Sequence, residues 1–479
     1  MRWILAVLIF GEIHMIFRHC KSLSSALAVT GVLTAGIAFA GVSPQDKARI
    51  GLEGTELTPA GAIRAGNTEG TIPAWKNEPI KPPAGFTPGS FHPDPFAGDK
   101  VLFTITAQNY QEHADKLSAG QKQMFQTYPD FKMNIYPTRR SVVYKPFIYE
   151  AALKNLDRSE LVHADINMGI VGFTGARKSW AFPMPKNGDE AWMNQATKPI
   201  NPWMESWETT LAITSTGDYV VNRLNVQQHQ KWSDPEIPDE AFDPEAPSLM
   251  YYQTLTAPPK LAGQVVLAID PATFTKVFRR AWAYSPGQRR VKRAPQIVYD
   301  NPLTASDGLA TTDQKFGFNG PNDRFSYKLV GRKEMYVPYN AYKLWAKEAT
   351  PEKVITPEGR LNQDYARYEL HRVWVVDATL KEGTNHDYGR RTFYLDEDSW
   401  WITAMDGYDR RGDIWRYWES HNVVFYDTGF FHPITDVQYD MDAGRMIALM
   451  FDKEKGPDFS WRAPDTYFTP ASVRRNGVR

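Results

Sequence analysis

Two residue types in this sequence could act together chemically: aromatic residues and arginines on predicted strands. The aromatic set is Trp282, Tyr284, Trp374, Trp400, Trp401, Trp415 and Trp418. As the lining of a curved sheet, these rings would form a large apolar pocket, whereas as core residues they need no function. The arginine set is Arg139, Arg140, Arg279, Arg280, Arg289, Arg290 and Arg293. These could hold an anionic head group through paired hydrogen bonds or form a solvated face.

Carboxylates and histidines are weaker candidates. The polar loop that contains Asp300, Asp307 and Asp313 lacks the spacing and closing glutamate of a calcium loop, so turn and capping roles are favoured. His371 could be a general base beside Glu369, but a solvated strand face is the better interpretation. The sequence has no zinc-spaced histidine pair, no Gly-x-Ser-x-Gly and no phosphate-binding glycine loop. We therefore predict no catalytic residue, metal or cofactor, although two hydrolase carboxylates need only be close in space.

The stretch from Leu261 to Pro295 positions much of the aromatic set. Its alternation predicts three antiparallel strands, at Gln264–Ile269, Lys276–Tyr284 and Arg289–Val298. Residues 285–288, Ser-Pro-Gly-Gln, favour a type II turn in which Gly287 has a positive φ. Arg280, Trp282 and Tyr284 then share one face of the second strand.

A longer run of strands follows. Strands are predicted at Tyr368–Leu380, Gly389–Leu395, Trp400–Tyr408, Ile414–Tyr426 and Val437–Met441, and a hairpin at Thr209–Gln227. We expect residues from Leu261 to Met450 to form one curved antiparallel sheet, with Trp282 and Trp374 on its concave side. Helices are predicted at Asn109–Tyr128, with a break at Gly120, and at Phe147–Gly169 and Pro183–Trp203.

The domain organisation follows from composition. Residues 1–40 read as a signal peptide cleaved after Ala40, with Met15 the natural start and residues 1–14 an upstream extension. A membrane anchor is the alternative. We assign 41–100 to a Pro- and Gly-rich extended arm, 101–247 to helices and strands, 248–450 to the antiparallel meander and 451–479 to a tail. The arm could instead be a disordered linker.

Charge and cysteine usage narrow the compartment and the partners. The formal net charge of the 479 residues is zero, which argues against nucleic acid as a partner. The single cysteine, Cys20, lies in the segment to be removed, so the mature chain has no disulfide. Export without cysteines favours a Gram-negative periplasm.

Several motifs together resemble one exported proteobacterial family of unknown function, whose members often carry the label "outer-membrane lipoprotein-sorting protein". They are LTPAGAIRAGNTEGTIPAW, YPTRRSVVY, FPMPKNG, WAYSPGQRRVKRAPQIVYDNP, ELHRVWVVDATLKEGTNH and FYLDEDSWWITAMDGYD. The label implies a likeness to the lipoprotein carriers LolA and LolB, whose fold is an incomplete antiparallel barrel around an apolar cavity. The family also implies work beside exporters of the resistance-nodulation-division class. It supplies no catalytic residues.

The residues and the resemblance together favour one function. We predict an α+β, mainly β protein with a LolA/LolB-like half-barrel that carries a lipid or other hydrophobic ligand in the periplasm. The predicted ligand-binding residues are Trp282, Tyr284, Trp374, Met405 and Arg280. The alternatives are an envelope hydrolase acting on a glycan or ester, and an exporter subunit without a ligand.

Overall fold

The structure is a computed structural model that describes residues 42–164, 169–451 and 453–477. The predicted signal peptide and its cleavage site at Ala40 lie outside these residues. In the part of the chain that is described, no helix is long and apolar enough to cross a membrane.

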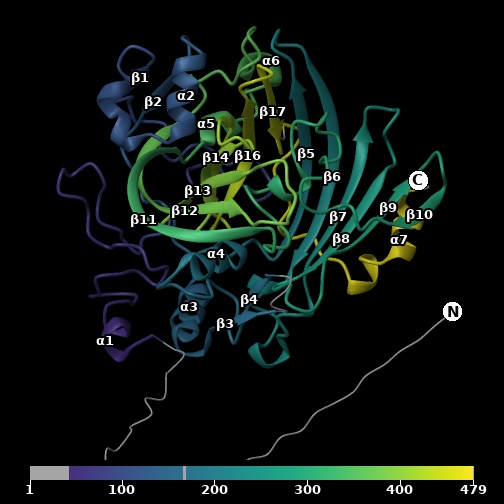
Figure 1. The fold of residues 1–479 in the computed structure, drawn as a ribbon, viewed down its shortest axis with the longest axis horizontal. Helices are drawn as coiled ribbons and strands as arrows, with labels where there is room; N and C mark the ends of the chain where they lie inside the picture. Colours follow the sequence, from purple (N-terminus) through teal and green to yellow (C-terminus); the bar gives the residue numbers. More distant parts are fainter. Residues whose placement is uncertain (1–41, 165–168, 452, 478–479) are drawn as a thin grey trace, which may run out of the picture. The chain divides into compact units, whose positions relative to one another are not determined.

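One sheet of fifteen strands dominates the fold (Figure 1). Its spatial order is β1 (Phe103–Thr106), β2 (Lys132–Ile135), β12 (Tyr368–Leu380), β13 (Arg390–Asp396), β14 (Ile402–Tyr408), β15 (Ile414–Phe425), β16 (Phe430–Asp440), β17 (Arg445–Leu449), β5 (Trp203–Ile213), β6 (Tyr219–Gln230), β7 (Pro247–Ala257), β8 (Val265–Pro271), β9 (Arg280–Ser285) and β10 (Arg290–Arg293). The long, bent β11 (Phe325–Pro338) pairs with β12 off this path. Neighbours are antiparallel except β2 and β12, and β1 and β10 are edge strands. The sheet is therefore not closed.

A loop fills the concave face of this sheet. We call residues 299–322, which include the short 3-10 helix η4 (Thr312–Gln314), the plug. Phe318 packs against Phe393 on β13 with ring centroids 6.3 Å apart, and Lys315 donates to Glu208 on β5 at 2.8 Å. In a flat sheet, five strand spacings would separate β13 from β5 by about 24 Å. Two side chains three residues apart can reach both strands only because the sheet curves around them.

Short helices cover the sheet. The α-helices are α1 (Pro44–Lys47), α2 (Ala119–Thr127), α3 (Pro146–Arg158), α4 (Gly188–Ala196), α5 (Tyr342–Trp345), α6 (Pro351–Val354) and α7 (Pro470–Gly477). The remaining 3-10 helices are η1 (Tyr110–Lys116), η2 (Lys231–Ser233), η3 (Asp239–Ala241) and η5 (Asp465–Tyr467), and β3 (Glu160–His163) pairs with β4 (Val171–Thr174) in a small separate sheet. On α4, Trp192 stacks on Tyr327 of β11 with centroids 4.3 Å apart, whereas α7 lies against β8, β9 and β10. The helices thus cover both faces of the sheet.

Asp406, on β14, accepts four hydrogen bonds and fixes the N-terminus of α2. It accepts hydrogen bonds from the Ser118 hydroxyl, from the backbone N–H groups of Ala119 and Gly120, and from the Tyr394 hydroxyl. A carboxylate at the N-terminus of α2 satisfies donors that the helix leaves unpaired. Gly120 is therefore a contact point inside α2, and the break in the predicted helix lies just before it, at Leu117 and Ser118.

The architecture confirms the predicted fold class, a curved antiparallel sheet with helical additions. Several local predictions are wrong. The helix predicted over 147–169 ends at Arg158 and gives way to β3, and the helix predicted over 183–203 is confined to α4. Arg289, not Gly287, has the positive φ, 52°, because Ser285 pairs with Arg290 and the four-residue loop between them ends in a left-handed residue.

Candidate functional site

An apolar cavity of about 330 Å³ lies between the plug and strands β7 to β9. Side chains two apart on a strand share a face, so Val266 and Ala268 on β8 point into it together, beside Ala283 on β9. The other apolar lining residues are Leu249, Tyr251, Val265, Tyr284, Ile297, Pro302, Leu303 and Phe316. The small side chains on β8 and β9 leave the space that larger ones would fill.

A fixed cation stands at one side of this cavity. The Lys315 ammonium donates to Glu208 Oε2 and to the Tyr251 hydroxyl, each at 2.8 Å. Burial alone would lower the pKa of Lys315, but Glu208 and Tyr251 outweigh it and raise that pKa above its ordinary value. Burial raises the pKa of Tyr251 to about 12. Lys315 therefore stays charged and ties the plug to β5 and β7.

A second ion pair also lines the cavity. Arg279 donates hydrogen bonds from Nε to Asp270 Oδ1 at 2.8 Å and from Nη2 to Asp270 Oδ2 at 2.6 Å. Nη2 also donates to Asn319 Oδ1 at 2.7 Å. This two-point pairing leaves neither charge in need of a ligand. The cavity therefore presents a mainly apolar lining that includes two internally satisfied ion pairs.

A smaller cavity of about 110 Å³ borders the first one, since Phe316 and Asn319 line both. It contains Lys198, whose ammonium donates to the Gln195 carbonyl at 2.8 Å and lies 4.7 Å from the centre of the Trp401 ring. Among the residues described, no carboxylate pairs with it. Burial lowers the pKa of Lys198 to about 7. Of the lysines and arginines that line these two cavities, Lys198 is the one without an acidic partner among the described residues.

The five residues predicted to bind a ligand do not form one site. Tyr284 borders the larger cavity, but Trp282, Trp374, Met405 and Arg280 line neither cavity. Instead, Arg279, the neighbour of Arg280, lines the larger one. The role of the five in binding stays a prediction.

Register explains why Trp282 lies away from the cavity. Residues paired across neighbouring strands lie on the same face of the sheet, so one face can be traced from β12 to β9 through successive pairs. From β12 to β5 the pairs are Val375–Tyr394, Tyr394–Ala404, Ala404–Glu419, Glu419–Val437, Val437–Ala448 and Ala448–Leu211. Glu205 is on the same face of β5 as Leu211, and from it the pairs continue as Glu205–Gln227, Gln227–Tyr252, Tyr252–Leu267 and Leu267–Trp282. Trp282 thus shares a face with Val375, and its adjacent residue Trp374 points the other way. The prediction that Trp282 and Trp374 share the concave face is wrong.

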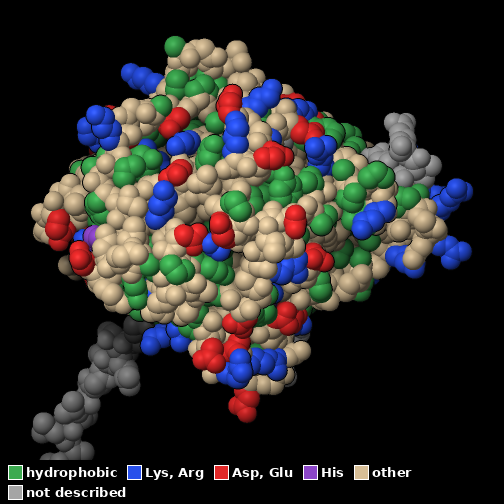
Figure 2. All heavy atoms as spheres, turned by 90° about the horizontal axis from the view of Figure 1, so that it is seen from above, with side chains coloured by type: hydrophobic (Ala, Val, Ile, Leu, Met, Phe, Trp, Pro, Cys, Tyr) green, Lys and Arg blue, Asp and Glu red, His purple; other side chains and the backbone are tan. Residues whose placement is uncertain are grey.

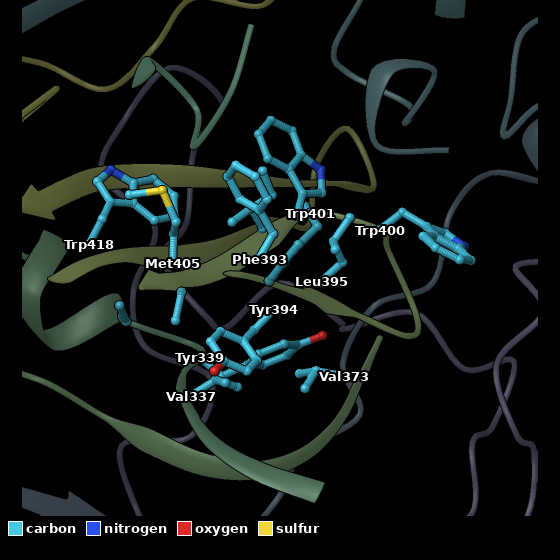
Figure 3. Packing of buried hydrophobic residues seen from close by; sticks show 14 of the residues in the cluster. Val337, Tyr339, Val373, Phe393, Tyr394, Leu395, Trp400, Trp401, Met405 and Trp418 are labelled. Carbon is cyan, nitrogen blue, oxygen red and sulfur yellow. The ribbon is translucent and has the colours of Figure 1, made fainter. Parts of the chain in front are cut away.

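The contacts of these side chains agree with the register. Trp282 and Tyr284 pack around a cluster that includes Phe468 and Val473 of the C-terminal segment. Trp374 stacks on Trp400 with centroids 5.3 Å apart, beneath the Arg332 guanidinium. Met405 is fully buried beside Trp418, as Figure 3 shows. Each of these tryptophans and the methionine packs against other side chains of the fold.

A buried carboxylate cluster is the second group with unusual chemistry. Asp396, Glu397 and Asp398 form the β13–β14 turn and are at most 3% exposed. Arg140 holds both Asp398 oxygens, at 2.9 and 2.6 Å, and His371 Nδ1 lies 3.9 Å from Asp396 Oδ1. Burial raises the pKa of Asp396 to about 6 and that of Glu397 to about 7. None of the three lines either of these two cavities.

The prediction for His371 and Glu369 needs correction. His371 and Glu369, expected on a solvated strand face, are 2% and 0% exposed, with His371 Nε2 3.1 Å from Glu369 Oε2. Tyr339 stacks on this histidine, which the strand alone does not reveal. Asp313 of the plug is also buried. Burial alone would raise its pKa, but Arg391, 3.0 Å away, and His386 lower it to about 2.

The residues that line the cavity left weak signals in the sequence. Alanines at Ala268, Ala281 and Ala283 on neighbouring strands mark a place where side chains are short. The long polar loop 299–322 gave no sign that it enters the sheet's concave face. Lys315 and Tyr251 lie 64 residues apart and meet only through the fold.

Comparison with known proteins identifies the family. The chain matches the model described as "Protein of unknown function (DUF1329)" over residues 104–474. The uncharacterized protein PA3922 of Pseudomonas aeruginosa is 40% identical over 470 residues, which cover 97% of this chain and 99% of that protein.

Solved structures give lower similarity. A putative outer membrane lipoprotein-sorting protein domain from Vibrio parahaemolyticus has a TM-score of 0.41 and 13% identity, and covers 60% of this chain and 98% of its own. A DUF1329 family protein from Desulfovibrio piger has a TM-score of 0.40 and 12% identity, and the match covers 59% of this chain and 95% of that protein. The LolA superfamily protein NE2245 from Nitrosomonas europaea has a TM-score of 0.35 and 10% identity, and the match covers 60% of this chain and 98% of that protein. The family match and the Pseudomonas relative together show that this chain belongs to the DUF1329 family, as its motifs predict.

Proposed function

We propose that this protein binds a hydrophobic ligand in the cavity between the plug and strands β7 to β9 and carries it through the periplasm. The observation that carries the proposal is the cavity itself: about 330 Å³ on the concave face, with an apolar lining. Ligand sites in proteins range from about 300 to 1,000 Å³ and combine such a lining with few polar groups. This cavity falls at the lower end of that range.

The size and charge of the cavity limit the ligand. If a methylene occupies about as much space as a water molecule, about 30 Å³, the cavity holds a chain of roughly ten carbons. Burial of each methylene contributes about 0.8 kcal/mol. Since Lys315 and Arg279 are already paired with Glu208 and Asp270, the ligand in this proposal is held mainly by apolar contacts.

The hydrolase alternative has less support. It needs a carboxylate pair in an accessible cleft, whereas Asp396 and Glu397 lie outside both cavities. A transfer partner completes the carrier proposal. An exporter of the resistance-nodulation-division class or an outer-membrane protein is the candidate recipient.

The test is a fluorescence titration of the folded mature protein with a fluorescent fatty acid or phospholipid, followed by displacement with unlabelled lipids. We expect saturable binding of medium-length acyl chains. If no member of a panel of lipids and hydrophobic small molecules binds saturably, the carrier proposal fails and the exporter-subunit alternative is favoured.

A further inference from the structure

Cations without partners gather at one end of the sheet. The exposed residues are Arg289, Arg290, Lys292 and Arg293 on the β9–β10 hairpin and Arg474 and Arg475 on α7. We call these six residues the basic face. Because α7 packs against β9 and β10, the two groups lie together. Figure 2 shows Lys and Arg side chains projecting at the end where Figure 1 places β9, β10 and α7.

Nothing within the described chain neutralises this face. Residues 271–299 contain no aspartate or glutamate, and neither do residues 466–479. The other cations of the first segment include two that are paired, Lys276 with Glu245 and Arg279 with Asp270. None of the six cations of the basic face forms an ion pair with a described residue. Six like charges held together repel one another unless an anion binds them.

Protection of a sheet edge explains only part of this pattern. β10 is an edge strand, and charged side chains on such a strand prevent pairing with other chains. Arg474 and Arg475 lie on a helix, however, where no edge needs protection. Half-buried Trp282 and Trp461 lie beside the charges, around the cluster beneath α7. Exposed cations with tryptophan beside them are typical of surfaces that lie on anionic bilayers.

The basic face also adjoins the cavity. Gln296 and Ile297, which line the larger cavity, lie three and four residues after the end of β10, and Ala283 on β9 lines it as well. We propose that the basic face binds an anionic membrane surface and so places the cavity next to the lipid. This inference goes beyond the proposed function and is tested without any cavity ligand.

The size of the effect follows from the number of charges. Each basic residue near an anionic surface strengthens binding by about fivefold. Replacing four of them is therefore expected to weaken binding by at least about 100-fold. The attraction is screened by salt, since the Debye length falls from about 10 Å at 0.1 M to about 3 Å at 1 M.

The experiment is cosedimentation of the mature chain with phosphatidylcholine vesicles, with and without phosphatidylglycerol. The hairpin variant combines Arg289→Gln, Arg290→Gln, Lys292→Gln and Arg293→Gln. A second variant, with Arg474→Gln and Arg475→Gln, leaves the hairpin untouched and guards against a folding defect. The matched control removes four exposed lysines that form no ion pair with a described residue: Lys76→Gln, Lys81→Gln, Lys328→Gln and Lys347→Gln.

We expect binding to the anionic vesicles only, loss of that binding at high salt and in the hairpin variant, and a smaller loss in the α7 variant. The control is expected to bind like the wild type. Absence of binding to anionic vesicles would overturn the proposal. Equal loss in the hairpin variant and the control would also overturn it, because net charge rather than the basic face would then explain the result.

Discussion

Filling the cavity without disturbing the sheet is the sharpest test of its role. Ala283 lies on β9, pairs with Val266 and lines the larger cavity. The substitution Ala283→Leu adds three carbon atoms on this lining. At about 30 Å³ each, they take up roughly 90 Å³ of the cavity. That is about a quarter of the 330 Å³.

The loss of affinity follows from this volume. A ligand that loses burial for about three methylenes at ~0.8 kcal/mol each loses about 2.4 kcal/mol, or roughly 60-fold in dissociation constant. Leucine suits a strand at least as well as alanine, so the free energy of unfolding should not fall by more than about 1 kcal/mol.

Titration with a fluorescent fatty acid measures the dissociation constant, and urea unfolding checks the fold. Ala443→Leu, in the exposed β16–β17 turn, is the matched control and should leave binding unchanged. A folded Ala283→Leu protein that binds as tightly as the wild type would refute the assignment of the cavity.

Three further predictions rest on individual contacts. Asp406→Ala should lower the free energy of unfolding in urea by about 3 kcal/mol or more, because four hydrogen-bond donors lose their acceptor; a loss below about 1 kcal/mol would contradict the proposed anchoring of α2. For Trp282→Ala, the sequence alone predicts weaker ligand binding, whereas its position on the opposite face predicts an unchanged dissociation constant and lower stability; a titration decides between them. Burial raises the pKa of Asp436 to about 7 in the folded state. Between the ordinary pKa of an aspartate and pH 7, Asp436 is therefore protonated in the folded state but ionised in the unfolded state. The contribution of Asp436 to stability should fall by up to about 4 kcal/mol as pH rises through this window, and Asp436→Asn should flatten the decline in a thermal-unfolding series; an identical pH profile would count against the shift.

Local pattern was sufficient for much of the sheet. Alternation of polar and apolar residues placed β8, β9 and β12 through β15, and the Ser-Thr-Gly-Asp turn placed the β5–β6 hairpin. These features depend on residues near one another in the chain. The family resemblance added the expectation of an incomplete barrel.

The facing of the strands depends on long-range pairing and was not predictable in the same way. β5, β6 and β7 enter the sheet between β17 and β8, where β5 pairs with β17 through Met446 and Ile213. Whether Trp282 and a given residue of β12 lie on the same face depends on the register of every strand pair between them. A shift of one residue in any of these pairs would place Trp282 on the other face. Sequence alternation within one strand carries no such information.

The interior of the curved sheet was the least predictable part. The plug reads as a polar loop because it contains aspartates and threonines, yet Asp313 is buried in an ion pair with Arg391 and Lys315 is half-buried in one with Glu208. Such pairs cancel the cost of burying a charge only when both partners meet, which a single stretch of sequence cannot show.

The proposed function requires that an apolar ligand occupies the cavity between the plug and β7 to β9. A crystal structure of the mature protein with a fatty acid of about ten carbons, brominated at its methyl end, tests it directly. We expect anomalous bromine density in contact with Ala283 and Phe316. Bromine found only beneath α7, beside Trp282, or no bound fatty acid at saturating concentration, would contradict it.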